Sequence, residues 1–443
     1  MKPEQFLTEN LRTHPHRDEV IKILAAAIQA VDPYEAVRQH LNLMDDNLHI
    51  GGYTYTLRRS RRIFLIGAGK AGLPMAKAAV DLLGSQIVDG VVIVKDGHGG
   101  PDHLGAVKIR EAGHPVPDQR GISATTEILS LLEQTGPDDL VLTVISGGGS
   151  ALMTAPIQGI SLAELQTLTN LLLKSGAEIR EINQLRRRLD RVKGGGLVQA
   201  AAPAKLAALI LSDVVGDPLE LIASGPTVLA TGQWQKASDI LQKYNLQEQM
   251  PDSIKAALRH PPPPPFAPKA ANNILVGNNR IAAEAAIQQA ATLGYQTELL
   301  TSSLSGEARK VGREYGGMLK MLAEENPHKP VMWVTGGETT VTVIGEGQGG
   351  RNQELALAAV EEIAGVTDAA LISLATDGED GPTEAAGAVV TGETLGQAQK
   401  IGLDPAKYLA NNDSYRFFKQ VGGCLVPGPT HTNVNDLLFL FSW

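Results

Sequence analysis

The chain has a single cysteine, Cys424, among its 443 residues, so no disulfide can form within it. Aromatic residues are also scarce, at 4%. No apolar run approaches the roughly 20 residues that a membrane-spanning helix needs. The first ten residues lack the apolar core of a secretory signal peptide. These absences predict a cytoplasmic protein that has no membrane partner.

Basic residues are outnumbered by acidic ones, which gives a net charge of −9 and excludes nucleic acid as a main partner. A local cluster of donors can still hold phosphate in an acidic protein. Hydrophobic residues make up 43% and charged residues 20%, which is a globular composition. The length exceeds what one compact core usually holds, so we expect two domains.

Predicted strands and helices alternate along the chain, after an opening segment, residues 15–45, that is expected to be helical. The strands of the first half are continuous apolar runs, which indicates a parallel sheet with helices on both faces. The fold class is therefore α/β with two α/β domains, the first Rossmann-like. The predicted boundaries are residues 1–258 and 271–443, joined by a proline-rich connection over residues 259–270.

Glycine-rich loops follow several predicted strands, where ligands bind in open α/β sheets. The loop Gly67-Ala-Gly-Lys-Ala-Gly72 resembles a dinucleotide fingerprint, but its third glycine comes one residue early. It retains a glycine turn, a helix start and Lys70, which together suit an anion. The alternative is a tight turn with a solvated Lys70.

A second loop has three consecutive glycines between two serines, and its residues are Ser146, Gly147, Gly148, Gly149 and Ser150. Glycines let the backbone approach a ligand closely and turn successive N–H groups inward. The pattern is not a Walker A loop, and it suits a phosphate or an oxyanion. A plain strand-to-helix turn is the alternative.

Five positive charges follow between Arg186 and Lys193. Most of these arginines are expected on a solvated helical face. Lys193 differs because it precedes Gly194 and Gly195, an arrangement like that of Lys70. The last glycine-rich stretch, residues 345–350, ends at a predicted helix start. Arg351 lies there, where a guanidinium can fork onto a carboxylate or a phosphate.

Acidic residues also follow predicted strands: Asp213 and Asp217 after one, and Asp377 after another. Magnesium binds hard carboxylate oxygens beside phosphate, usually one or two per ion. The alternative for these residues is loop capping, since aspartate is common in turns. Glycine loops, cations and carboxylates at strand ends are what phosphoryl transfer needs, because it is catalysed by positioning and charge neutralisation.

Ten motifs in order give the chain a resemblance to the class II glycerate kinases, or glycerate 2-kinases, which end in a MOFRL domain. The motifs cover nearly the whole chain and are residues 67–71, 113–117, 146–152, 192–195, 212–217, 222–227, 336–338, 350–354, 376–382 and 432–436. The chain departs from the family pattern in three places. One is Leu229-Ala230 after Gly225-Pro-Thr-Val228, where a more polar pair is expected. Asp190 replaces an expected serine and Gly196 an expected arginine, both beside the predicted phosphate site.

The resemblance implies ATP, a divalent metal taken as Mg²⁺, and conversion of D-glycerate to 2-phosphoglycerate. It also implies an active site in the cleft between the domains, with Lys70 and Arg351 as its lysine and arginine. On this hypothesis Asp213 or Asp217 binds magnesium, and Asp377 accepts the hydroxyl proton. The ATP phosphates are held by the following residues: Ser146, Gly147, Gly148, Gly149, Ser150, Lys193, Gly194 and Gly195.

Two rival functions follow from the same residues. The first is an NAD(P)H-dependent hydroxypyruvate reductase, which needs a dinucleotide fingerprint and an acidic ribose anchor. The second is a sensor that binds a sugar acid or a nucleotide without turnover. The sequence leaves open the position of phosphorylation on physical grounds, the metal preference, the nucleotide base and whether the chain forms a homo-oligomer.

Overall fold

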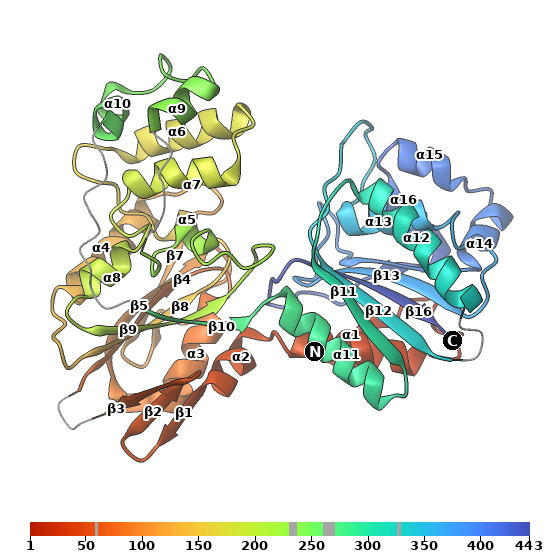
Figure 1. The fold of residues 1–443 in the computed structure, drawn as a ribbon, viewed down its shortest axis with the longest axis horizontal. Coiled ribbons are helices and arrows are strands. Elements are labelled where there is room, and N and C mark those ends of the chain that lie inside the picture. Colours follow the sequence, from red (N-terminus) through yellow and green to blue (C-terminus); the bar gives the residue numbers. More distant parts are fainter. Residues whose placement is uncertain (58–60, 230–236, 260–270, 326–328) are drawn as a thin grey trace. The chain divides into compact units, whose positions relative to one another are not determined.

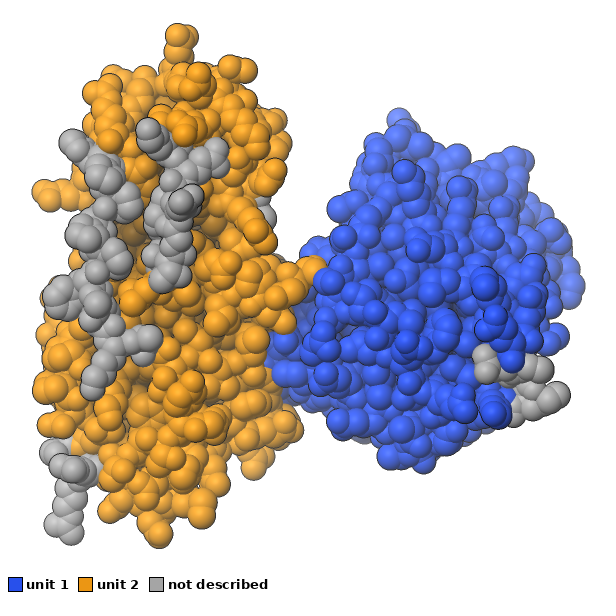
Figure 2. Space-filling model, in the orientation of Figure 1, with its two compact units in different colours: residues 1–32, 277–443 blue, residues 33–276 orange. Residues whose placement is uncertain are grey.

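The computed structural model describes residues 1–57, 61–229, 237–259, 271–325 and 329–443 (Figure 1). The chain forms two compact units (Figure 2). Unit 2 holds residues 33–276, and unit 1 holds residues 1–32 together with residues 277–443. The predicted boundaries assign residues 1–32 to the first domain instead. Residues 260–270 of the predicted proline-rich connection lie outside the described residues.

The opening segment, expected to be helical over residues 15–45, divides at Pro33. Helix α1 (Arg17–Gln29) belongs to unit 1, whereas α2 (Pro33–His40) begins unit 2. Proline has no N–H for a helical hydrogen bond and restricts the residue before it, so a helix ends ahead of it or begins with it. The chain then enters a small antiparallel sheet of β1 (Leu41–Met44), β2 (Asn47–Ile50) and β3 (Tyr53–Thr56).

Unit 2 is built on a seven-stranded sheet with the order β10-β9-β8-β4-β5-β7-β6. Its strands are β4 (Ile63–Ala68), β5 (Ile87–Lys95), β6 (His103–Leu104), β7 (Val107–Ala112), β8 (Leu140–Ile145), β9 (Lys205–Leu211) and β10 (Asn272–Gly277). Strands β9, β8, β4, β5 and β7 are parallel. Their carboxyl ends therefore meet at one edge, where the predicted loops lie.

Helices cover both faces of this sheet, as the continuous apolar strands predict. Helix α3 (Gly72–Leu83), followed by the short turn η2 (Gly84–Gln86), packs on one face. Helices α4 (Gln119–Leu132) and α8 (Gly196–Ala201) pack on the other, around Ile66, Val91 and Ile128. The site loops are thus supported by a core that is buried on both sides.

Four further helices of unit 2 share a separate hydrophobic core (Figure 1). They are α6 (Leu162–Lys174), α7 (Ile179–Arg188), α9 (Ala237–Lys243) and α10 (Asp252–Arg259). Helix α7 ends at Arg188, so the second helical stretch expected up to residue 201 is broken before α8. The break holds Lys193 and its glycines.

Unit 1 has a six-stranded mixed sheet with the order β11-β12-β16-β13-β14-β15. The strands are β11 (Gln296–Leu304), β12 (Val331–Gly337), β13 (Ala369–Ala375), β14 (Gly387–Thr391), β15 (Cys424–Leu425) and β16 (Asp436–Ser442). Strand β16 is antiparallel to both of its neighbours. Its first residue, Asp436, therefore pairs with the last residues of β12 and β13, Gly337 and Ala375.

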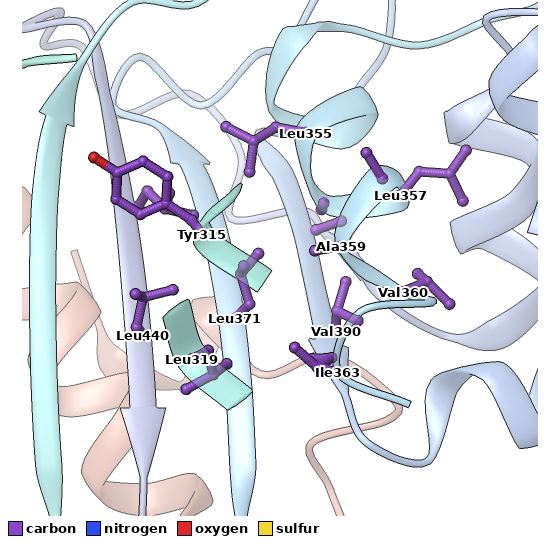
Figure 3. Close-up of a cluster of buried hydrophobic side chains, with 14 of the residues drawn as sticks. Tyr315, Leu319, Leu355, Leu357, Ala359, Val360, Ile363, Leu371, Val390 and Leu440 are labelled. Atoms are coloured by element: carbon purple, nitrogen blue, oxygen red, sulfur yellow. The ribbon is translucent and has the colours of Figure 1, made fainter. Parts of the chain in front are cut away.

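The faces of this sheet are covered by helices from distant parts of the sequence. Helices α12 (Ala308–Glu325), α13 (Arg351–Ala359) and α16 (Ser414–Val421) pack on one face, and α1 and α11 (Asn279–Thr292) on the other (Figure 1). The shorter helices η1 (Pro3–Phe6), α14 (Thr394–Lys400) and α15 (Pro405–Ala410) complete the unit. Leu319, Leu355, Leu371 and Leu440 meet in the core beneath α12 and α13 (Figure 3).

The predicted α/β class with a Rossmann-like parallel sheet is confirmed. The second sheet is mixed, because β16 enters it from the far end of the chain. Among the described residues, no helix combines the length and apolarity needed to cross a bilayer.

Candidate functional site

Lys70 lies on a turn that is hydrogen-bonded to the triple-glycine loop. Strand β4 ends at Ala68, and a Cβ atom at Gly69 would overlap the Ser146 hydroxyl, so the close approach requires glycine. The amide of Lys70 donates to the Gly147 carbonyl at 2.9 Å, and the amide of Ala71 donates to Ser146 Oγ at 3.0 Å. Two loops that are distant in sequence therefore form one surface.

The glycines of this loop admit side chains from three other strand ends. A side chain at Gly147 would overlap the carboxylate of Asp213, which follows β9. Gly148, with φ +83°, would place a Cβ atom 3.0 Å from the His114 ring and 3.4 Å from Lys70 Cγ. Lys70, His114 and Asp213 therefore surround the loop. Lys70 and Asp213 lie beside the same loop, as expected for residues that follow parallel strands of one sheet.

Backbone donors of the loop remain available for a ligand. Within the described part of the chain, the amides of Gly147, Gly148 and Ser150 donate no hydrogen bond. Buried or half-buried amides are normally paired, so consecutive unpaired N–H groups indicate an anion-binding concavity. No carboxylate lies within ion-pair distance of the half-buried Lys70 in the same residues.

His114 is a site residue that the sequence reasoning did not select. Burial, together with the neighbouring Lys70, Lys95 and His98, lowers the pKa of its imidazole to about 4. The ring is therefore neutral at physiological pH, and it has no hydrogen-bond partner among the described residues. Its position after β7, in the motif at residues 113–117, was the available signal.

The end of the loop is fixed by a chain of side-chain hydrogen bonds. Ser150 Oγ lies 2.8 Å from Ser224 Oγ, which in turn donates to Asn183 Oδ1 at 2.9 Å. Ser224 and its neighbour Ala223 have φ values of +64° and +49°. Such backbone strain is held only where the surroundings impose it, which is common at functional sites.

Lys193 lies in this neighbourhood but is fully engaged. Its ammonium, 3% exposed, is 2.5 Å from Asp190 Oδ2, and it also donates to Met153 O at 3.2 Å and to Thr154 Oγ1 at 3.3 Å. The amides of Gly194 and Gly195 donate to the carbonyls of Ser224 and Gly225. The direct phosphate contact of these three residues stays a prediction, and their observed contacts are internal.

Three of the four arginines before Lys193 are half-buried instead of solvated, contrary to expectation, whereas Arg191 is exposed as expected. Desolvation lowers the pKa of Arg186, Arg187 and Arg188. Arg187 Nε donates to the Ser224 carbonyl at 3.3 Å, while its Nη2 is buried and has no partner in the described residues. Arg187 therefore supports the segment of Ser224.

Asp213 and Asp217 are half-buried residues of the turn after β9. Asp213 lies against Gly147, and Asp217 has φ +54° at the end of the turn. The described residues contain no group of three acidic, histidine or cysteine side chains that could hold a metal by themselves. Magnesium commonly takes one or two carboxylates and completes its shell with phosphate and water. The carboxylate of Asp213, beside a loop that suits phosphate, therefore fits a magnesium ion.

A second polar cluster lies at the edge of the unit 1 sheet. Arg351 is the first residue of α13, and its Nε and Nη2 donate to Asp436 at 2.5 and 3.0 Å. Its Nη1 lies 2.9 Å from Glu338 Oε1, just beyond β12. Asn435 Nδ2 donates to the other Glu338 oxygen at 3.0 Å. The sequence reasoning selected Arg351 but missed its two carboxylate partners.

The glycines before Arg351 serve close packing. Side chains at Gly345, Gly347 or Gly349 would overlap the segment 411–414. That segment accepts the amides of the loop, including Gly347 N at Asn411 O, 2.9 Å, and Gln348 N at Asp413 Oδ1, 2.9 Å. The alternating glycines therefore hold the approach to α13 in place.

Asp380 occupies the amino end of α13. Its carboxylate accepts the amides of Asn352 at 3.1 Å and Gln353 at 2.9 Å, and burial raises its pKa. Asp377, half-buried at the end of β13, accepts the Glu379 amide at 3.2 Å. The predicted pair Arg351 and Asp377 thus lies at the ends of neighbouring elements of one unit.

Burial raises the pKa of Asp436 to about 6, although its contact with Arg351 opposes the shift. The net effect on Arg351 is a raised pKa, because Asp436 and Glu338 outweigh the desolvation. The guanidinium therefore stays charged while its anchor titrates near neutrality.

Glycine loops, a lysine and carboxylates at the edges of two α/β sheets are the arrangement of a phosphoryl-transfer enzyme. Residues 19–259 match the family model "Domain of unknown function (DUF4147)", and residues 331–436 match the MOFRL family. The chain belongs to the glycerate kinase family that contains these two domains.

Relatives cover almost the whole chain. The chain is 43% identical to D-glycerate 2-kinase of Thermotoga maritima over 94% of its length and 96% of the relative's. It is 37% identical to the Homo sapiens glycerate kinase, over 96% and 92%. The crystal structure of a Thermotoga maritima glycerate kinase superposes with a TM-score of 0.86 at 41% identity, covering 96% of this chain and 99% of that one. A solved Pyrococcus horikoshii protein gives 0.86 at 39%, covering 96% and 98%.

Proposed function

We propose that the protein is an ATP-dependent glycerate 2-kinase, which transfers the γ-phosphoryl group of ATP to the 2-hydroxyl of D-glycerate. One observation supports this most directly. Lys70, which has no ion-pair partner in the described residues, lies beside the unpaired amides of Gly147 and Gly148 at the carboxyl edge of the unit 2 sheet. Amide donors without a hydrogen-bond partner and a lysine without an ion-pair partner suit a phosphate chain.

Within unit 2, the loop from Ser146 to Ser150 holds the ATP phosphates through its backbone. Lys70 neutralises charge that develops on the transferring group. We assign Lys193, Gly194 and Gly195 an indirect part in the same site. The amides of the two glycines hold the segment of Ser224, which contacts Ser150, and Lys193 holds Thr154, whose hydroxyl donates to the Ser150 carbonyl. Neutral His114 supplies a hydrogen bond beside Lys70.

Asp213, with Asp217 behind it in the turn, would hold Mg²⁺ next to the phosphates. When bound, the ion neutralises phosphate charge and polarises the phosphoryl oxygens. Asp213 is the better placed of the two because its carboxylate lies against Gly147. The predicted cleft between the domains stays a prediction.

Within unit 1, Arg351 binds the carboxylate of D-glycerate and Asp377 accepts the proton of its 2-hydroxyl. That oxygen attacks the γ-phosphorus as the bond to the β–γ bridging oxygen breaks. ADP leaves with the electron pair, and the proton passes to Asp377. Asp436 keeps the guanidinium oriented throughout.

The product distinguishes this function from its rivals. We expect ADP release from ATP with D-glycerate, and a phosphorus NMR spectrum that shows 2-phosphoglycerate. Absorbance loss from NADH with hydroxypyruvate, without ADP release, would identify a reductase instead. Tight binding of D-glycerate or ATP with no product at all would identify a sensor.

A further inference from the structure

The guanidinium of Arg351 is shared by two carboxylates with very different exposure. Asp436 accepts from Nε and Nη2 and its side chain is only 10% exposed. Glu338 contacts Nη1 at 2.9 Å and its side chain is 43% exposed. Arg351 itself is 33% exposed. One contact is therefore part of the unit's interior, and the other lies at its surface.

These two contacts differ in how easily a ligand can displace them. Breaking a buried charge pair leaves an uncompensated charge and is strongly unfavourable, whereas an exposed pair contributes little to stability. An incoming anion can therefore displace Glu338 readily and Asp436 only with difficulty. The order of displacement follows from burial.

The arrangement of the N–H donors of Arg351 also indicates that Glu338 is the contact a ligand would replace. A guanidinium has five N–H donors, and a carboxylate binds best to two of them in a fork. Asp436 already takes a side-on fork at Nε and Nη2. The remaining fork lies between Nη1 and Nη2, and Glu338 lies at its Nη1 arm. A second carboxylate can use that fork fully only if Glu338 leaves.

We propose that Glu338 occupies the outer fork of Arg351 in the absence of substrate, and that the carboxylate of D-glycerate displaces it on binding. The inference rests on the proposed function, because it takes Arg351 as the carboxylate-binding residue. Asn435 keeps Glu338 nearby through its other oxygen at 3.0 Å. Glu338 thereby lowers the affinity for D-glycerate and selects for ligands that carry a carboxylate.

The test is Glu338→Gln, which removes the competing charge and keeps the shape. We expect the KM for D-glycerate to fall up to about fivefold, as an exposed ion pair allows, with kcat and the KM for ATP unchanged. Inhibition by D-glyceramide, the uncharged amide of the substrate, should not change. Glu346→Gln is the matched control, because it removes an exposed glutamate of the same unit that forms no ion pair with another described residue.

Several results would overturn the inference. An unchanged or raised KM for D-glycerate in Glu338→Gln would do so, and so would an equal gain in affinity for D-glyceramide. A loss of kcat of about a hundredfold would place Glu338 in the chemistry instead. If the unaltered protein made no phosphoglycerate, the proposed function itself would fail, whereas normal turnover with an unresponsive Glu338→Gln variant would remove only the exchange.

Discussion

The carboxyl edge of the unit 2 sheet and the polar edge of the unit 1 sheet differ in how their basic side chains are paired. In unit 2, the ammonium of Lys70 forms no ion pair and the amides of Gly147 and Gly148 donate no hydrogen bond within the described residues, although the carboxylate of Asp213 lies against Gly147. In unit 1, Arg351 is already held by Asp436 and Glu338. The unit 2 edge therefore presents a lysine without an ion-pair partner. At the unit 1 edge, the charge of Arg351 is balanced and its orientation is fixed.

This difference explains how a protein of net charge −9 can handle two anions of different size. A triphosphate carries several charges and gains from donors that have no other partner. A small hydroxy acid carries one charge and is selected by the direction of its hydrogen bonds. The predictions below test whether the first edge acts through charge and the second through orientation.

The largest expected effect is at Lys70. In Lys70→Met, we expect kcat to fall by about two to three orders of magnitude, as when a preorganised donor to a developing charge is removed. Lys77→Met is the control, since Lys77 lies on the adjacent helix α3 and pairs with Asp81 at the surface. ADP release measures both. Full turnover in Lys70→Met would show that the uncompensated charge is not used.

The second prediction makes the same lysine-to-methionine substitution at Lys193, which also lies beside glycines, so that its effect can be compared with that of Lys70→Met. Lys193→Met leaves the Asp190 carboxylate buried without its partner, so we expect the free energy of unfolding to fall by about 3 kcal/mol. The KM for ATP of the folded protein should change little. Denaturant unfolding and initial rates measure the two quantities. A large rise in the KM for ATP with unaltered stability would restore Lys193 as a direct phosphate ligand.

These two lysines also show how far sequence reasoning reaches. Both stand beside glycines after or between predicted elements, and nothing local distinguishes them. The parallel strands could be predicted from their apolar runs, and their shared edge placed Lys70, Ser146 and Asp213 together. The burial of Lys193 depends on how α7 and the segments around it pack, which the local sequence pattern does not contain.

The cluster around Arg351 shows more clearly what could not be predicted from the sequence. Arg351 was recognisable at a helix start, but its anchor Asp436 comes 85 residues later in the chain. It reaches the site only because β16 runs antiparallel between β12 and β13. Such long-range pairing leaves no local pattern. The division of residues 15–45 between two units was, in contrast, signalled by Pro33.

The third prediction tests orientation at Arg351. In Asp436→Asn, the side-on fork loses its charge, so we expect the KM for D-glycerate to rise about tenfold while kcat changes less. The folded pKa of about 6 lies above the ordinary value, so the ionised carboxylate destabilises the folded state as pH rises through roughly 4 to 6. The variant should therefore be no less stable than the parent at pH 7.

Rate measurements across pH sharpen this third prediction. The parent should show a rising KM for D-glycerate as pH falls below about 6, where Asp436 takes a proton. Asp436→Asn should lack that rise and keep its high KM at every pH. A variant whose KM stays normal would mean that Arg351 needs no anchor, and a parent-like pH profile would place the titration elsewhere.

The smallest expected effect concerns His114 in the cationic edge. Its folded pKa of about 4 lies below the ordinary value of 6.5, so the unfolded chain binds a proton first as pH falls. The stability that this residue contributes is complete above pH 6.5 and is lost as pH falls toward 4. His114→Gln should therefore flatten the stability profile in that window by about 1 kcal/mol, after allowance for solvent screening. His103→Gln, at an exposed residue of β6, should leave the profile unchanged. Equal slopes for His114→Gln and the parent would mean that neither burial nor the charge of Lys70 holds the imidazole neutral, which would weaken the contrast between the two edges.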